Sequence, residues 1–275
     1  TLWQQRRQEL GARFDESGEA VRYTFRLYSA PAGPGQRMEA GPGVRRGLWH
    51  SLGVEDGLLA AHVPALWPDR QGYLWLATSR GISRFDGAEF LHFGLADGLA
   101  DHPVQALLED RQGRLWLGTG GDDPGTGRGL CCYDGKEVTT FTTADGLGSD
   151  VIRCLWEDSQ GRLWVGTEGG LSRYDGEAFT PFTTADGLLD NEVETLYEDR
   201  SGHLWIATRG GGVSRYEGTR FQSFPAEGIG LRARVGNFLE DQHGVLWLGS
   251  SDGVRRYDGQ QFVPFPVEEA LGTVG

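Results

Sequence analysis

The sequence predicts an all-β protein built from repeated four-stranded antiparallel sheets. Two observations carry this prediction. Short apolar runs of four to six residues are bounded by glycine or aspartate, which is typical of strands joined by tight turns. A Leu-Trp dipeptide recurs along the chain at a nearly constant spacing, with its tryptophans at Trp75, Trp116, Trp164, Trp205 and Trp247.

The spacing of these tryptophans indicates a propeller-like array. Successive intervals are 41, 48, 41 and 42 residues, a period found in β-propellers. The one long interval contains a glycine- and aspartate-rich stretch at 120–128, which we interpret as an insertion of about seven residues into a loop. The repeat therefore keeps its register on both sides of the insertion.

Each unit contains four short apolar runs in the same order. The first, exemplified by residues 104–108, is nearly continuously apolar and fits an inner strand buried on both faces. Asp110 and Gly113 then form a turn, Leu115 and Trp116 begin the second strand, and an Asp-Gly hairpin separates the third strand from the fourth. A single small sheet leaves its faces under-buried, so the units must pack against one another.

Residues present in almost every unit need a reason common to every unit. We therefore expect the repeated aspartates to cap turns and the repeated tryptophans to lie in the core. Gly118, two residues after Trp116, suggests close packing across an interface between units. Cys131, Cys132 and Cys154 show no disulfide or metal-ligand spacing and are expected to be small strand or core residues.

The predicted organisation has two parts. Residues 1–46 form an N-terminal extension, with one or two helical turns at 3–10, a strand at 21–28 and a Pro/Gly-rich linker at 30–43. Residues 47–275 hold five full repeats, and 49–52 align with a preceding fourth strand while 267–272 read as a connector. Either the chain is a segment of a longer array, or its N-terminal residues supply a missing blade. The expected units are about 58–94, 99–141, 147–182, 188–224 and 229–265.

The consensus DGLxxxxVxxLxEDRxGxLWxGTxGGLSRYDGxxFxxF, assembled from residues 97–141 and 145–182, closely resembles the two-component regulator propeller repeat. The resemblance covers roughly residues 48–270 and includes the Ala-Asp-Gly-Leu connector at 96–99, 144–147 and 185–188. It implies a sensor propeller of a bacterial two-component or hybrid signalling protein. Related sensor propellers are seven-bladed and precede membrane-anchored histidine kinases or related output domains. The resemblance therefore also implies an attached signalling output domain and a periplasmic or otherwise extracytoplasmic location.

Composition and motifs exclude several classes of function. A net charge of −13 repels phosphate backbones and anionic lipids, so nucleic acid and membrane surfaces are not expected partners. No apolar run approaches the roughly 18 residues of a membrane span, so no direct membrane insertion is expected. The six histidines show no metal-ligand spacing, and no nucleophile elbow, phosphate loop or dinucleotide fingerprint occurs. We predict no catalytic residue, no metal and no cofactor, and therefore no enzyme.

Function is best sought where the repeats differ. In a four-stranded blade, the connector before the first strand and the loop between the second and third strands emerge on the same face, which we call the connector face. Arg153 and Glu194 occupy the same inner-strand position in successive units, and they are expected either to pair with each other or to contact a ligand or water. The candidate ligand-binding residues are Arg80, Gln105, Arg153, Glu168, Asn191, Glu194, Arg209, Arg232 and Arg234.

Three functions follow from this pattern. The leading hypothesis is a non-catalytic sensor that binds a small polar ligand such as a sugar on the connector face. The alternative is a protein interaction scaffold that uses the acidic insertion at Asp122 and Asp123 to bind a protein partner. An enzyme similar to propeller lyases would require a catalytic base, and the sequence offers no identifiable one.

Overall fold

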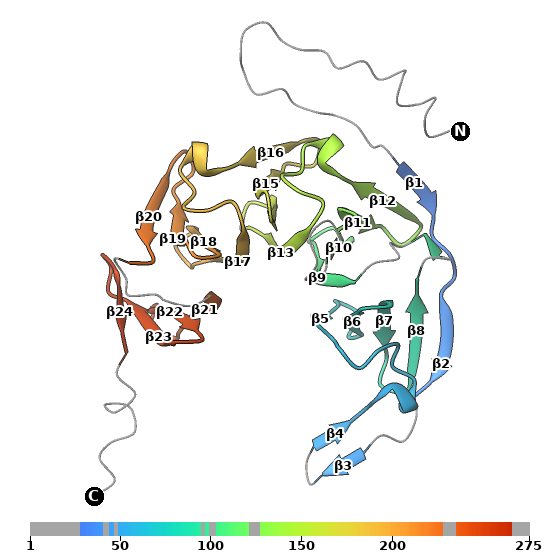
Figure 1. Ribbon diagram of the computed structural model, residues 1–275. Helices are drawn as coiled ribbons and strands as arrows, with labels where there is room; N and C mark the ends of the chain where they lie inside the picture. Colours follow the sequence, from blue (N-terminus) through green and yellow to red (C-terminus); the bar gives the residue numbers. More distant parts are fainter. Residues whose placement is uncertain are drawn as a thin grey trace, which may run out of the picture.

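The computed structural model describes residues 28–40, 44–46, 49–94, 97–98, 103–120, 127–227 and 235–265. These residues form five antiparallel blades arranged in an arc, with the first strand of each blade on the inside (Figure 1). The all-β prediction is confirmed. Blade 1 contains β5 (Leu66–Pro68), β6 (Leu74–Thr78), β7 (Gly81–Phe85) and β8 (Glu89–Phe93); blade 2 contains β9 (Val104–Glu109), β10 (Leu115–Thr119), β11 (Leu130–Tyr133) and β12 (Glu137–Phe141). Blade 3 contains β13 (Ile152–Glu157), β14 (Leu163–Thr167), β15 (Gly170–Tyr174) and β16 (Phe179–Phe182); blade 4 contains β17 (Val193–Glu198), β18 (Leu204–Thr208), β19 (Gly212–Tyr216) and β20 (Phe221–Pro225); blade 5 contains β21 (Val235–Glu240), β22 (Leu246–Ser250), β23 (Gly253–Tyr257) and β24 (Phe262–Pro264).

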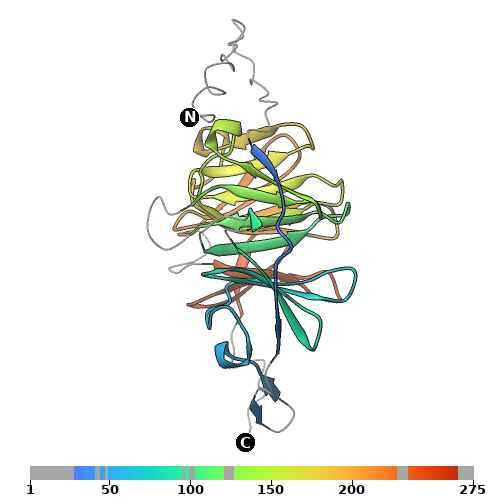
Figure 2. The same ribbon diagram turned by 90° about the vertical axis from the view of Figure 1, so that its right-hand side faces the viewer.

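The N-terminal part differs from the expected linker. β1 (Tyr28–Pro31) pairs antiparallel with β12, and β2 (Gln36–Glu39) pairs antiparallel with β8, so residues expected to be a linker add a fifth strand to two blades. Figure 2 shows this segment running along the outer edges of the two sheets. The linker prediction for 30–43 was wrong because an outer strand offers unpaired N–H and C=O groups, which a partner can bond through its backbone without an alternating side-chain pattern. The helix expected at 3–10 and all but the last residue of the strand expected at 21–28 lie outside the described residues.

A short hairpin precedes blade 1. β3 (Val44–Arg46) pairs with β4 (Trp49–Ser51), so the segment aligned with a fourth strand has an antiparallel partner. The connector that follows forms a 3-10 turn, η1 (Val54–Asp56), and the equivalent turns after blades 2 and 3 are η3 (Thr143–Asp145) and η4 (Thr184–Asp186). In η3 the Asp145 carboxylate accepts a hydrogen bond from the Thr142 backbone N–H at 2.8 Å, and Gly146 ends the turn at a φ of 98°. This explains the recurring Ala-Asp-Gly-Leu motif.

The core lies between blades, as the repeat predicts. Trp116 and Trp164 are fully buried, and each ring contacts a tyrosine of the next blade, Tyr174 at 5.6 Å and Tyr216 at 5.2 Å between ring centroids. The adjacent Cys131 and Cys132 belong to the clusters on opposite sides of blade 2, and both side chains are buried. Each blade is therefore stabilised mainly by its neighbours.

His92 of β8 is a buried imidazole that makes the stability of blade 1 depend on pH. Its Nδ1 lies 2.9 Å from the Ser83 hydroxyl oxygen, and burial lowers its pKa, while a contact with the Gly57 carbonyl acts the other way. The unfolded chain then binds a proton at a higher pH than the folded one, so the free energy of unfolding should fall as pH drops below about 6.5. Urea unfolding at pH 5 and pH 7 measures this loss. His92→Asn, which can keep the bond to Ser83, should show a smaller loss, and an unchanged pH dependence would contradict the assignment.

Candidate functional site

The turn between the first and second strands is built around one aspartate. Asp110 Oδ1 accepts the backbone N–H groups of Gln112 and Arg114 at 3.0 and 2.9 Å, and Oδ2 accepts the Trp116 indole N–H at 2.8 Å. The predicted turn capping is confirmed, and the indole bond adds a second role that pattern alone did not show. The same indole bond is made in all five blades, by Asp69, Asp110, Asp158, Asp199 and Asp241.

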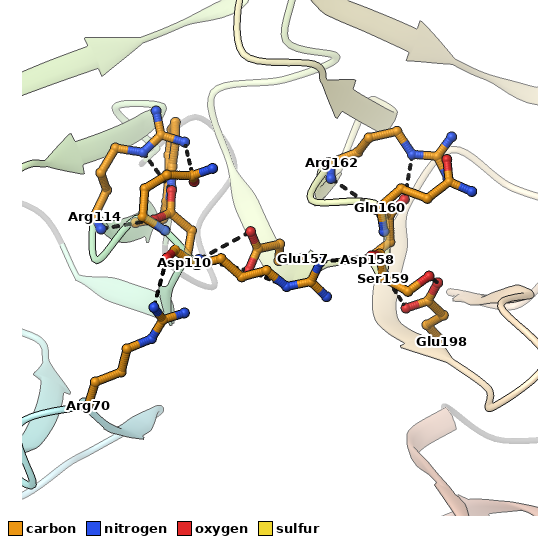
Figure 3. Close-up of polar contacts among 12 residues, drawn as sticks. Arg70, Asp110, Arg114, Glu157, Asp158, Ser159, Gln160, Arg162 and Glu198 are labelled. Carbon is orange, nitrogen blue, oxygen red and sulfur yellow. Dashed lines mark hydrogen bonds and ion pairs between the residues drawn. The ribbon is translucent and has the colours of Figure 1, made fainter.

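A second repeated contact joins each blade to the one before it. The glutamate that ends the first strand of a blade accepts the backbone N–H that follows the turn aspartate of the preceding blade; we call this contact the latch. Glu157 bonds to Arg111 N at 3.0 Å, and Glu198 bonds to Ser159 N at 2.7 Å (Figure 3). Glu109 and Glu240 make the same contact, whereas blade 1 has Pro68 at this position. The latch lies on the face that carries these turns, which we call the turn face.

On the connector face, ionisable side chains from blades 3 and 4 form a group that we call the connector cluster. Arg153 of β13 is bonded through Nη2 to Glu168, and Arg209 Nη1 lies 2.6 Å from Glu192 Oε1. Glu194 of β17 completes the group. The pKa of Arg209 is raised, chiefly by its hydrogen bond to Glu192 and the charge of that residue, with smaller contributions from Glu194 and Glu168. The cluster comprises Arg153, Glu168, Glu192, Glu194 and Arg209.

The structure therefore places four of the predicted site residues together and adds Glu192, which sequence reasoning missed. Arg153 pairs with Glu168 of its own blade, a partner that the sequence analysis did not name. The signal for Glu192 was present, because the equivalent positions hold His62, Pro103 and Val151 in the first three blades.

The remaining predicted site residues lie elsewhere. Gln105 donates from Nε2 to the Gly120 carbonyl at 3.4 Å, within blade 2. Asn191 Oδ1 accepts the Thr184 backbone N–H at 2.8 Å and so holds the connector between blades 3 and 4. Arg80 is exposed in the turn between β6 and β7. Arg232, Arg234 and the acidic pair Asp122 and Asp123 lie outside the described residues.

Two further groups bear on the chemistry of the connector cluster, the Cys154 thiol and the buried Nε of Arg153. Burial, and secondarily the charge of Glu194, raises the pKa of Cys154 far above its ordinary value, so this thiol is not a nucleophile. Arg153 Nε is buried without a hydrogen-bond partner among the described residues. Within those residues no group of three or more His, Cys, Asp or Glu side chains is arranged to hold a metal ion. The cluster is thus equipped for hydrogen bonding.

None of the helices found in the described part of the chain has the length and apolar character needed to cross a bilayer.

Comparison with known proteins agrees with this geometry. The sequence model described as "Two component regulator propeller" matches residues 98–121, 146–169 and 187–210, which hold the first two strands of blades 2, 3 and 4. No curated protein matches the chain.

Among solved structures, the extracellular domain of a putative hybrid two component system from B. thetaiotaomicron is similar, with a TM-score of 0.67, 21% identity, and coverage of 93% of this chain and 36% of that chain. PorZ, a surface component of the type-IX secretion system of Porphyromonas gingivalis, has a TM-score of 0.61 and 19% identity, covering 76% of this chain and 34% of that chain. Virginiamycin B lyase from Staphylococcus aureus has a TM-score of 0.56 and 13% identity, covering 74% of this chain and 69% of that chain.

These identities establish the fold alone, and the chain spans about a third of the length of the first two structures. The fold they establish is the propeller expected from the repeat. It shows that this chain is a β-propeller, and three of its repeats match the two component regulator propeller model.

Proposed function

We propose that the chain is the non-catalytic sensor part of a bacterial signalling protein and binds a small polar molecule, such as a sugar, at the connector cluster. The observation that carries this proposal is the convergence of five ionisable side chains that do not recur from blade to blade. At the position of Arg153, the other blades have Pro64, Gln105, Glu194 and Gly236. A structural need common to all blades does not account for such variation, whereas a single binding site on one part of the blade array does.

The chemistry of the cluster suits a hydroxylated ligand. Two guanidinium groups donate and three carboxylates accept, and a sugar hydroxyl can do both. The Arg209–Glu192 pair is exposed on the arginine side, so a ligand can replace part of it without leaving a buried charge unpaired. The ligand-binding step therefore exchanges one set of hydrogen bonds for another.

The connector gives a route from binding to signalling. Glu192 lies directly after Asn191, which holds the connector between blades 3 and 4 through the Thr184 N–H. A ligand that draws Glu192 away from Arg209 would shift this connector and the packing of the two blades. The family resemblance supports an attached output domain that reads the shift. The similar extracellular domains of B. thetaiotaomicron support an extracytoplasmic location for this chain.

The test uses Arg209→Gln and Glu192→Gln, which remove one charge each with little change in volume. Small polar molecules, including neutral sugars, are screened with the wild-type chain by thermal shift, and each hit is titrated by calorimetry. We expect the affinity for a true ligand to fall by about tenfold or more in both variants, because each loses a charge-assisted hydrogen bond. Glu177→Gln, an exposed hairpin residue on the turn face, is the matched control. Unchanged binding of every hit by Arg153→Gln, Glu194→Gln and Arg209→Gln would overturn the proposed site.

A further inference from the structure

A second feature distinguishes blades 3 and 4, this time on the turn face. A groove of about 280 Å³ lies between the turn of blade 3, the turn of blade 4 and the hairpin that joins β19 to β20. Gln160 and Arg162 line one side, and His203, Tyr216 and Glu217 line the other. We call it the turn-face groove, and three departures from the repeat lie in it or beside it.

The first departure is Ser159. At the equivalent position in blades 1, 2 and 4 an arginine reaches across the blade interface: Arg70 Nη1 bonds to the Arg111 carbonyl at 2.7 Å, and Arg111 Nη1 bonds to the Ser159 carbonyl at 2.8 Å. Arg200 points at the Gln242 carbonyl in the same way, at 3.5 Å. Ser159 is too short to cross, and its hydroxyl bonds to Glu198 instead, at 2.7 Å (Figure 3). The interface between blades 3 and 4 therefore lacks the arm that spans the other three.

The second and third departures stand on the blade 4 side. His203 replaces the arginine that blades 2 and 3 place four residues after the turn aspartate, and its Nδ1 lies 3.3 Å from Asp199 Oδ2. Glu217 replaces the hairpin aspartate, whose equivalent in blade 3, Asp175, accepts two backbone N–H groups. The longer Glu217 side chain is held at the groove by Arg215 and Arg220, each at 2.8 Å. Each change shortens or redirects a side chain next to the groove.

The groups that remain at the groove are mixed in character. Arg162 uses its Nε to bond Asp158 at 2.6 Å, and its side chain is 28% exposed, so its guanidinium edge and the exposed Gln160 amide are donors available at the rim. Glu198 and Glu217 contribute carboxylate oxygens. These carboxylates and the net charge of −13 disfavour an anion, and the charge of Glu217 is already offset by Arg215 and Arg220, which disfavours a cation.

We propose that the turn-face groove binds an uncharged polyhydroxyl molecule of about the size of one or two sugar rings. Hydroxyl groups accept from Arg162 and Gln160 and donate to Glu198 and Glu217, so both kinds of partner in the groove are used. The site lies on the face opposite the connector cluster, and it is a separate site from the one proposed above.

The decisive variant is Ser159→Arg, which restores the residue found in three other blades, removes the hydroxyl bond to Glu198 and places the missing arginine side chain across the blade interface beside the groove. Because the repeat accommodates arginine at this position, the variant is expected to fold with at least wild-type stability. Ser251→Arg adds the same side chain to the exposed loop of blade 5 on the connector face and is the matched control. His203→Arg is a second variant that also restores the repeat.

The probes are glucose and maltose, with glucuronate and glucosamine as charged analogues, titrated by ligand-observed NMR. We expect a neutral probe to bind with a millimolar Kd, at least fivefold tighter than the charged analogues. Ser159→Arg should weaken it tenfold or more, and Ser251→Arg should change it less than twofold. The inference is overturned if neither neutral probe binds, if a charged analogue binds more tightly, or if Ser159→Arg binds like the wild type. Arg209→Gln should leave this binding intact, so failure here and failure of the connector cluster can be told apart.

Discussion

Replacing Asp158 with alanine is expected to lower the free energy of unfolding by about 4 kcal/mol, because several buried donors lose one shared charged acceptor. The carboxylate is 2% exposed. It accepts the backbone N–H groups of Gln160 and Arg162 at 3.0 and 2.9 Å, the Arg162 Nε at 2.6 Å and the Trp164 indole at 2.7 Å. The indole is fully buried between blades 3 and 4, so water cannot replace the hydrogen bond that its N–H would lose. Urea unfolding followed by tryptophan fluorescence measures the loss.

Asp241→Ala in blade 5 is the matched control. Asp241 makes the same bond to Trp247, at 2.9 Å, but this turn is more exposed, so water can replace the carboxylate and the loss should be clearly smaller. Equal losses for the two variants, or a loss below 1 kcal/mol for Asp158→Ala, would show that the turn carboxylate is not a main support of the blade interface.

Adding one methyl group at Gly118 should cost about 2 kcal/mol, because it overpacks the interface between blades 2 and 3. A Cβ built at this glycine would lie 2.5 Å from Ile152 Cγ2 of the next blade. Two other interfaces show what would relieve the clash: Ala77 packs in one cluster with Val104, and Ala207 packs in one cluster with Val235. Where alanine stands at this position, the facing residue of the next blade is valine, whereas Gly118 faces isoleucine and Gly166 faces both Val193 and the Cys154 sulfur.

The double variant Gly118→Ala and Ile152→Val should therefore regain most of the stability lost by Gly118→Ala alone. A double-mutant cycle of the four proteins, measured by thermal and urea unfolding, gives the coupling free energy, which we expect to exceed about 1 kcal/mol. Gly94→Ala, where a Cβ meets nothing within 4 Å, should be nearly neutral. Additive losses would mean that the close approach of these residues does not limit the packing.

What could be predicted from the sequence is what every blade repeats. Trp116 and Asp110 could be assigned because four further copies of each occur in the same local context, and local context decides turns and short strands. The latch was not predicted because its partners lie far apart in the chain, as with Glu157 and Arg111, which are 46 residues apart. Its only trace was the Glu-Asp dipeptide at the end of the first strand.

The connector cluster was predictable as a location but not as a set of contacts. Arg153, Glu168, Glu194 and Arg209 stood out because the repeats differ at their positions. Arg153 bonds to the carboxylate that packing places nearest to it. That carboxylate belongs to Glu168, in the loop after the second strand of blade 3. The strands β1 and β2 were missed for a similar reason, since their pairing uses backbone groups and leaves no pattern in the side chains.

The latch also has a direction. Its acceptor always belongs to the later blade and its donor to the earlier one, and Pro68 leaves the first blade with no carboxylate to offer. During synthesis from the N-terminus, each nascent blade would therefore secure its predecessor as soon as its own first strand forms. Blades would assemble one after another, with one blade added for roughly every forty residues released from the ribosome. The most recently formed blade would always be the least stable, because no later blade has yet bonded to it.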